Sequence, residues 1–198
     1  MTRILALLLL APLAGNAQPA CPTGADLARG IRVNFDDGGT QFLRRGGEPG
    51  VVRVEGQASD GAPYRMDLAQ GLYMLTYAYL TPDGAPDEGT RVSYDYGLAP
   101  TALPVPTPGS RFQGTVTISD SAGSFKQAVS QATGQPERRD IGGCPYEALP
   151  LAIAYDGTNA YTEGLDYLPE LGIALLRWQE STDMPRYDLA PVSIGLGK

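Results

Sequence analysis

Hydrophobic and polar residues alternate with a period of two through most of the chain. Ile31, Val33 and Phe35 alternate with polar residues, and the range 112–118 repeats the pattern. Successive side chains of a strand point to opposite faces, so this period predicts β-strands. Less regular alternation and short apolar runs predict further strands around 52–54 and 64–68 and over 40–45, 72–80, 90–96, 149–155, 161–168 and 173–178.

Two segments depart from simple alternation. The segment Thr23–Gly30 is predicted to form one or two helical turns, with Thr23 as the cap and Gly30 as the stop. Ser124–Thr133 fits both a helical stripe and one face of a strand, and the neighbouring strands favour a strand.

Turn signals separate the predicted strands. Asp-Gly pairs are typical of tight hairpins because glycine tolerates positive φ, and they occur at Asp37-Gly38, Asp60-Gly61, Asp83-Gly84 and Asp156-Gly157. The expected fold is all-β and mostly antiparallel, with ten or more strands and at most one or two short helices. We expect a curved sheet or a partly open β-barrel.

The mature chain is predicted to be a single β domain, residues 18–198. The stretch 98–110 contains Pro100, Pro104, Pro106 and Pro108. Proline lacks a backbone donor, so this stretch is predicted to be a semi-extended crossing and no interior strand. It is the candidate boundary between two possible halves, 21–97 and 110–198.

Three acidic residues precede the last strong apolar run. Glu163, Asp166 and Glu170 are spaced so that on a helix they would form a metal-binding or acid-base face. Gly164 and Pro169 oppose a helix. The segment is therefore predicted to be a hairpin, with Glu163 and Asp166 on opposite faces of one strand and Glu170 in water at the turn.

The same hairpin carries a resemblance. The run from Tyr167 to Ile173, preceded by Gly143, Cys144 and Tyr146, resembles the closing hairpin of small uncharacterised exported proteins from bacterial envelopes. In shape these are similar to the open half-barrels of periplasmic lipoprotein carriers, in which a curved antiparallel sheet holds an acyl chain. The resemblance covers about residues 141–178 and implies an architecture; it brings no catalytic residues.

The first residues predict export. Residues 1–17 combine Arg3, an uncharged apolar run and small residues at the end, which is typical of a signal peptide cleaved between Ala17 and Gln18. The run is too short to cross a bilayer, and we expect no transmembrane segment and a periplasmic or secreted protein. Lipid attachment at Cys21 is a weaker alternative, because Gln18, Pro19 and Ala20 do not form the small apolar run that lipidation requires.

The two cysteines of the chain, Cys21 and Cys144, are predicted to form a disulfide, as an even count suggests in an exported protein. A redox pair is the alternative, but the C-x-x-C spacing that lowers a thiol pKa is missing.

Composition narrows the chemistry. The net charge of −7 argues against nucleic-acid binding, and the absence of histidine removes Ser-His-Asp and Cys-His catalysis and histidine-ligated zinc. We expect no cofactor and no metal site, since the acidic loop 83–89 lacks the order of a calcium loop. We expect no enzyme, although a carboxylate pair acting on a glycan stays open as a third hypothesis.

Tyrosines supply the candidate site. The chain has 11 tyrosines against 4 phenylalanines, and alternation predicts that Tyr73, Leu75, Tyr77 and Tyr79 share one strand face. That face either packs within the domain or lines, together with Tyr94 and Tyr96, a groove for an amphiphile or glycan. The leading hypothesis is a non-catalytic binding or carrier module for a lipophilic ligand. The second is an envelope structural protein whose tyrosine face docks a protein partner; the oligomeric state is left open.

Overall fold

The chain folds into one large antiparallel sheet. The structure is a computed structural model that describes residues 20–157 and 160–197. The described strands are β1 Ile31–Phe35, β2 Thr40–Arg45, β3 Val51–Gln57, β4 Pro63–Ala69, β5 Tyr73–Tyr79, β6 Val92–Asp95, β7 Arg111–Asp120, β8 Gly123–Thr133, β9 Glu137–Ile141, β10 Cys144–Asp156, β11 Tyr161–Leu168, β12 Ile173–Ser181, β13 Tyr187–Asp188 and β14 Pro191–Leu196. Two short 3₁₀ helices, η1 Gly24–Ala28 and η2 Pro100–Ala102, complete the set.

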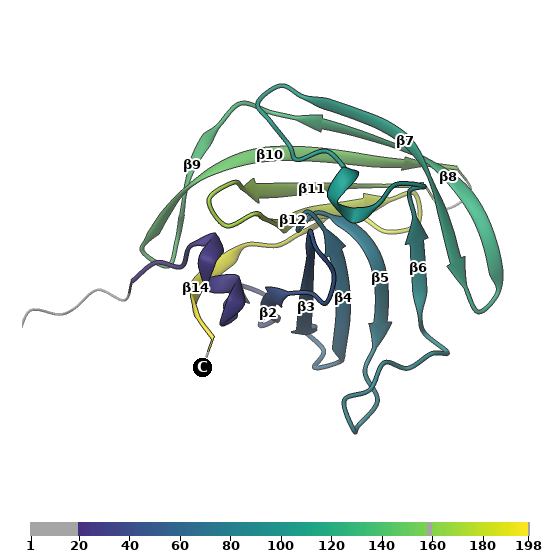
Figure 1. Ribbon diagram of the computed structural model, residues 1–198, viewed down its shortest axis with the longest axis horizontal. Helices are drawn as coiled ribbons and strands as arrows, with labels where there is room; N and C mark the ends of the chain where they lie inside the picture. Colours follow the sequence, from purple (N-terminus) through teal and green to yellow (C-terminus); the bar gives the residue numbers. More distant parts are fainter. Residues whose placement is uncertain (1–19, 158–159, 198) are drawn as a thin grey trace, which may run out of the picture.

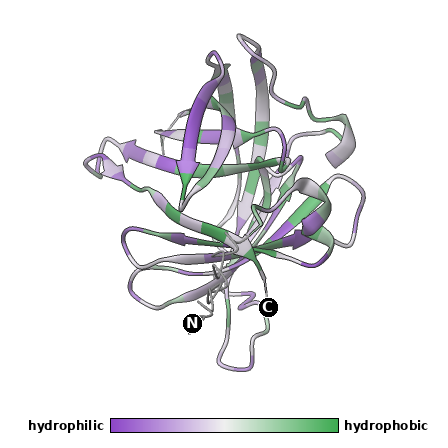
Figure 2. Cartoon of the chain, turned by 90° about the vertical axis from the view of Figure 1, so that its left-hand side faces the viewer, coloured by the Kyte–Doolittle hydropathy of each residue, from purple (hydrophilic) through white to green (hydrophobic). Residues whose placement is uncertain are grey.

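The sheet is curved and open. Its strand order is β13-β12-β11-β10-β8-β7-β6-β5-β4-β3-β2-β1-β14, with β9 paired to β10 off this path. In Figure 1 the long strands β7, β8 and β10 run across the top of the molecule, with β11 and β12 beneath them. The strands β2 to β6 occupy the lower part of the view. Hydrophobic and hydrophilic stretches alternate along the strands (Figure 2). The expected all-β curved sheet is confirmed.

Most local predictions are confirmed. The ambiguous segment is the strand β8, which pairs with β7 over residues 123–132 and with β10 over residues 128–133. Gly38, Gly61, Gly84 and Gly157 all have positive φ, as the Asp-Gly turns require. The proline-rich stretch holds η2 and no strand, while β6 and β7 on either side of it are hydrogen-bonded neighbours, so the sheet continues across it.

Three strands were not predicted. β9 reads Glu-Arg-Arg-Asp-Ile, β13 has two residues, and β14 contains Pro191 and Gly195. β9 and β13 lack an apolar alternation, whereas in β14 Val192, Ile194 and Leu196 alternate with Ser193 and Gly195. Each of the three strands pairs with a neighbour in the sheet, β9 with β10, β13 with β12 and β14 with β1.

Apolar side chains form two cores. The first gathers Ile31, Val33, Leu43 and Val54 from β1 to β3, and the second gathers Val116, Val129, Leu151 and Ile153 from β7, β8 and β10. β10 serves both, because Cys144, Tyr146 and Ala148 belong to the first core and the residues from Leu149 onward to the second.

The β11–β12 hairpin also contributes to both cores, so it is covered on two faces. Leu168, Ile173 and Leu175 pack in the first core, whereas Tyr167 and Ala174 pack in the second. Its turn approaches the β4–β5 turn so closely that a Cβ atom on Gly71 would lie 2.1 Å from the carbonyl oxygen of Gly172. The backbone N–H of Ala174 donates to the carbonyl oxygen of Gly71 at 2.8 Å.

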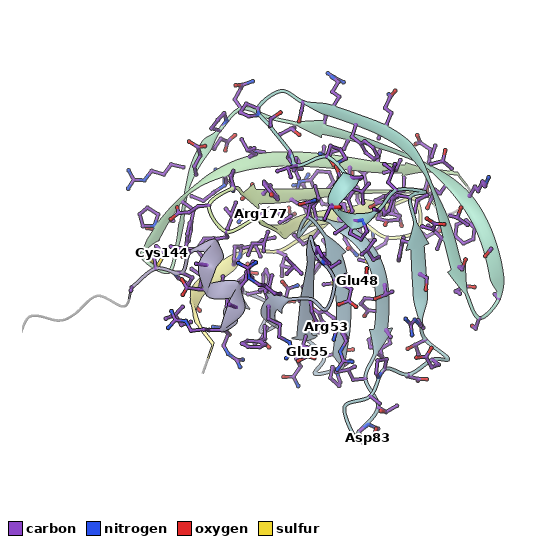
Figure 3. All side chains as sticks on the ribbon, viewed as in Figure 1. Glu48, Arg53, Glu55, Asp83, Cys144 and Arg177 are labelled. Atoms are coloured by element: carbon purple, nitrogen blue, oxygen red, sulfur yellow. A yellow bond between two sulfur atoms is a disulfide. The ribbon has the colours of Figure 1, made fainter. Side chains whose placement is uncertain are left out.

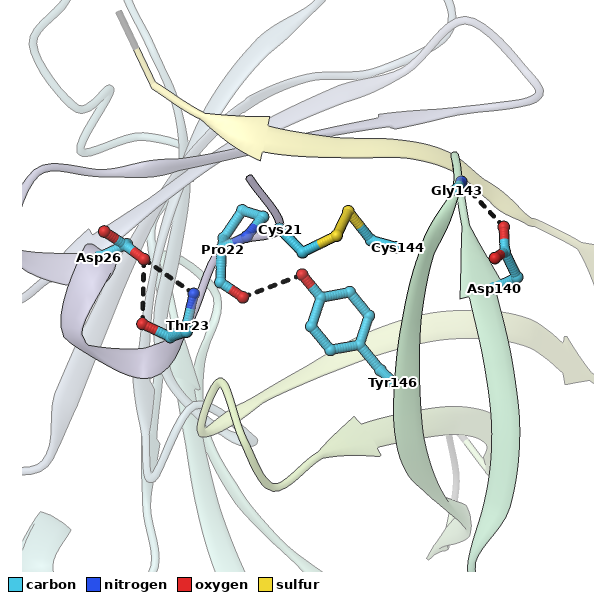
Figure 4. Close-up of a disulfide and its surroundings, with 8 residues drawn as sticks. All are labelled: Cys21, Pro22, Thr23, Asp26, Asp140, Gly143, Cys144 and Tyr146. Carbon is cyan, nitrogen blue, oxygen red and sulfur yellow. Dashed lines mark hydrogen bonds between the residues drawn. A yellow bond between two sulfur atoms is a disulfide. The ribbon is translucent and has the colours of Figure 1, made fainter. Parts of the chain in front are cut away.

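The start of the described chain is fastened to the sheet. Thr23 caps η1, as predicted, and its N–H donates to Asp26 Oδ2 at 2.8 Å. The predicted disulfide joins Cys21 to Cys144 at the beginning of β10 (Figure 4). Beside it, the Tyr146 hydroxyl donates to the carbonyl oxygen of Pro22 at 3.0 Å. Because its Sγ is bonded to Cys144, Cys21 has no free thiol for lipid attachment.

The predicted signal peptide and its cleavage between Ala17 and Gln18 lie outside the described residues and stay predictions. Within the described part of the chain, no helix has the length and apolar character needed to cross a membrane. The disulfide is of the kind found in exported proteins.

Candidate ligand-binding groove

A groove of about 640 Å³ opens between the two sides of the curved sheet. One wall comes from β2 to β5 and the turns that join them, and the other comes from β10 to β13. Strands far apart in sequence face each other here because the sheet curls. The volume lies in the range of small-molecule sites, about 300–1,000 Å³.

One end of the groove is apolar. Met66 and Leu68 of β4, together with Met74 of β5, face Leu165 of β11 and Leu176 of β12. Methionine side chains are flexible and polarisable, so they adapt to apolar ligands of different shapes. This part of the lining favours a hydrocarbon group over a sugar.

Tyrosines line the middle of the groove. The rings of Tyr64 and Tyr77 stack with centroids 5.7 Å apart, and both side chains face the open space. The Tyr64 hydroxyl accepts a hydrogen bond from Gln41 at 3.0 Å. Burial is the largest cause that raises the pKa of Tyr64 and of Tyr77, so both phenols are neutral at physiological pH.

Glu163 lies at the other end of the groove. Its Oε1 accepts a hydrogen bond from the Tyr155 hydroxyl at 3.3 Å, and both residues belong to the lining. Burial raises the pKa of this carboxyl to about 7, opposed by the hydrogen bond from Tyr155. Among the described residues, no arginine or lysine nitrogen pairs with it.

A second hollow of about 340 Å³ adjoins this end. It shares Tyr155 and the segment Met184–Arg186 with the groove, and it is also lined by Tyr161, Asp156 and Glu180. The rings of Tyr155 and Tyr161 stack with centroids 4.3 Å apart. Burial, followed by the nearby Glu163 carboxylate, raises the pKa of both phenols. The lining thus changes from apolar at Leu165 to polar at Glu163 and Tyr161 along a single strand, β11.

Comparisons with known proteins assign no family to the chain. No protein-family model matches it, and no curated protein matches it significantly. It is similar to the crystal structure of the hypothetical lipoprotein YmcC from Escherichia coli (K12), with a TM-score of 0.44 and 13% identity over 85% of this chain and 83% of that one. This likeness is too distant to transfer a role.

The structure separates the five predicted tyrosines. Tyr77 lines the groove, and Tyr79 lies beside it, with ring centroids 5.5 Å apart and 43% of its surface exposed. Tyr73 and Tyr96 are buried in the second core, against which Tyr94 also packs. The Tyr73 ring meets that of Tyr96 edge to face, and its hydroxyl donates to the carbonyl oxygen of Pro104.

A β-bulge explains the separation and corrects the expectation of one tyrosine face. Opposite the step from Asp67 to Leu68, β5 carries Leu75 as an extra residue. Tyr77 therefore pairs with Met66 and Met74 with Leu68, which places them on the face of the groove, whereas Tyr73 pairs with Ala69 and points the other way. Strict alternation fails between Tyr73 and Tyr77 because a bulge shifts the register by one residue.

Glu163 is not among the site residues that the sequence predicts. Alternation does place Glu163 and Asp166 on opposite strand faces, and the structure confirms this: Glu163 contacts Tyr155, and Asp166 pairs with Arg139 at 2.9 Å. One feature of the sequence could have pointed to it: Glu163 alternates with Tyr161 and Leu165, so the three side chains lie on the same face of the strand. Alternation alone gave no reason to expect that this acid faces a groove.

The acidic loop 83–89 lies apart from the groove lining. Asp83 projects at the tip of the loop that follows β5 (Figure 3). Its carboxylate accepts a hydrogen bond from the Thr81 hydroxyl, which lowers the pKa of Asp83. These contacts account for the acids as turn residues.

Proposed function

We propose that this protein is a non-catalytic binding or carrier module that holds an amphiphilic or lipophilic ligand in the groove. The observation that carries the proposal is the cavity of about 640 Å³ whose lining runs from apolar residues through tyrosines to the Glu163 carboxyl. Such a gradient matches a ligand with a hydrocarbon part and a polar part. The disulfide and the predicted signal peptide fit a module that works outside the cytoplasm.

The apolar lining favours this function over the alternatives. An apolar surface left open to water is unfavourable by roughly 25 cal/mol per Å². A groove that contains Leu165, Leu176 and three methionines is therefore stabilised when a ligand fills it. A docked protein would instead need a broad exposed face, and three of the five predicted tyrosines pack within the core.

The first test extracts whatever the protein carries. The mature protein is purified from its native host, extracted with organic solvent, and the extract is analysed by mass spectrometry. A stoichiometric amphiphile supports the proposal. Its expected loss in Tyr77→Ser, with retention in a Phe125→Ser control, would place it in the groove, because Phe125 is an exposed aromatic outside the lining.

A second measurement covers a ligand lost during purification. The neutral fluorescent probe N-phenyl-1-naphthylamine is titrated into the protein, and its emission reports an apolar environment. We expect saturable binding that Tyr77→Ser weakens and Phe125→Ser does not. An empty extract together with no saturable probe binding would contradict the proposal and move the function to partner docking.

A further inference from the structure

We propose that Glu163 forms the head-group site of the groove and that the ligand is an amphiphile with a cationic amine or ammonium head. This inference rests on the ligand-binding function proposed above and deepens it by naming the class of head group. It is carried by the placement of an unpaired carboxyl inside a tyrosine-lined cavity.

Among the described residues, Glu163 lacks the cationic partners that the acid on the opposite face of its strand has. The opposite face of the same strand carries Asp166, whose carboxylate is paired with Arg139 at 2.9 Å and Arg177 at 3.7 Å. Glu163 has no such cation, and its hydrogen bond is the 3.3 Å contact from Tyr155. An unpaired carboxyl ionises inside a cavity only at the cost of its burial, so a cationic group brought by a ligand would be stabilised beside it.

The surrounding charges favour a cation. Among the described residues that line the groove, the charged side chains are Asp37, Glu163 and Arg186. Arg186 is already paired with Asp188 at 2.9 Å and lies over the Trp178 ring at 4.4 Å. The adjoining hollow adds Asp156 and Glu180. The polar end is therefore acidic in balance, which disfavours an anionic head.

The aromatic lining points the same way. Tyrosine faces attract ammonium groups through the ring quadrupole, and the stacked pair Tyr155 and Tyr161 lies at the Glu163 end. A carboxylate beside aromatic rings can hold a primary amine through charge-assisted hydrogen bonds and a quaternary ammonium by charge and ring contact. The hydrocarbon part of the same ligand would extend toward Leu165 and Met74.

The inference makes binding depend on pH. The groups that face Glu163 are the phenols of Tyr94, Tyr96, Tyr155 and Tyr161, which stay neutral because burial raises their pKa. Asp37, Asp156, Glu180 and Arg186 are the charged groups of the linings around it. Since burial raises the pKa of Glu163 to about 7, the carboxylate that binds a cation forms above that pH. A cationic ligand should bind more tightly at pH 8 than at pH 5.5.

The experiment compares head groups on one hydrocarbon chain. Three compounds compete with N-phenyl-1-naphthylamine at pH 5.5 and pH 8: dodecyltrimethylammonium and dodecyl sulfate, each below its micelle concentration, and dodecanol below its solubility limit. We expect the ammonium compound to displace the probe at about tenfold lower concentration than the sulfate at pH 8, as for one charge-assisted contact. Its advantage should shrink at pH 5.5.

Two variants test whether Glu163 causes the preference for the ammonium head group. Glu163→Gln should remove most of the advantage and its pH dependence, whereas Glu170→Gln, an exposed acid at the turn of the same hairpin, should leave both unchanged. Equal displacement by all three compounds, a preference for the sulfate, or an unchanged preference in Glu163→Gln would overturn this inference while the binding function stands. If neither the probe nor any dodecyl compound binds the wild-type protein, the proposed function itself fails and the inference with it.

Discussion

The hydroxyl of Tyr155 on β10 donates to the carboxylate of Glu163 on β11 across a distance of 3.3 Å, inside the groove. Both side chains belong to the groove lining, and Tyr155 is also part of the second core. This pair marks the place where the curved sheet holds an ionisable group in an environment poor in water.

Glu163 should make the protein less stable as the pH rises. The pKa of its carboxyl is about 7 in the folded chain and about 4.3 in an unfolded one. The unfolded state releases the proton first, so the stability contribution is complete below about pH 4 and is lost as the pH rises through 7. Between pH 5 and pH 8 the loss should reach about 2 to 3 kcal/mol.

Urea unfolding at pH 5 and pH 8 checks this prediction. Glu163→Gln should remove this part of the pH dependence and should be more stable than the wild-type protein at pH 8. Glu170→Gln serves as the control and should behave like the wild type. Equal pH slopes for Glu163→Gln and the wild type would show that the carboxyl titrates as if exposed.

Gly71→Ala should destabilise the fold strongly. Gly71 has φ +64°, and its Cβ would lie 2.1 Å from the carbonyl oxygen of Gly172, so strain and a backbone clash combine. We expect a loss of about 3 kcal/mol in the free energy of unfolding. Gly84→Ala is the matched control: φ is +81°, but no atom lies within 4 Å of the added Cβ. It should cost about 1 kcal/mol, the strain of a left-handed residue.

The Cys21–Cys144 disulfide should contribute substantially to stability. It joins residues 123 positions apart, and the chain-entropy model gives an upper figure of about 4 to 5 kcal/mol for a loop of this size. Urea unfolding with and without reductant measures the loss. A Cys21→Ser, Cys144→Ser double variant should be as unstable as the reduced protein and should not respond to reductant. Identical unfolding midpoints for the oxidised and reduced wild type would contradict the prediction.

Asp166, which forms a buried ion pair, should contribute more to the free energy of unfolding than Asp188, which forms an exposed one. Its side chain is 7% exposed and pairs with Arg139, the pKa of which rises mainly through this hydrogen bond. Asp166→Asn should cost about 2 kcal/mol, because it leaves guanidinium groups without their buried partner. Asp188→Asn breaks the exposed pair with Arg186 and should change stability by about 0.5 kcal/mol or less. Chemical denaturation of both variants measures the two losses in the free energy of unfolding. Equal losses for Asp166→Asn and Asp188→Asn would contradict the prediction.

The sequence by itself determined the strands and turns that depend on local chemistry. Alternation marked β1 and β7 because period two is a property of the extended chain, and Asp-Gly pairs marked turns because glycine alone adopts positive φ at no cost. Two cysteines allowed a single intramolecular pairing. Gly164 and Pro169 excluded a helix through 163–170, which identified the β11–β12 hairpin before its partners were known.

Only the tertiary structure decided which side chains meet. The bulge at Leu75 depends on the pairing of β5 with β4, and it sends Tyr77 to the groove and Tyr73 to the core. The groove joins β2 to β5 with β10 to β13, so its lining depends on how far the sheet curls. Glu163 is a half-buried carboxyl without a cationic partner among the described residues. The sheet places it beside Tyr155 and places the arginines that pair with Asp166 on the other face. Such long-range neighbours leave no trace in local periodicity, and they set the chemistry of the site.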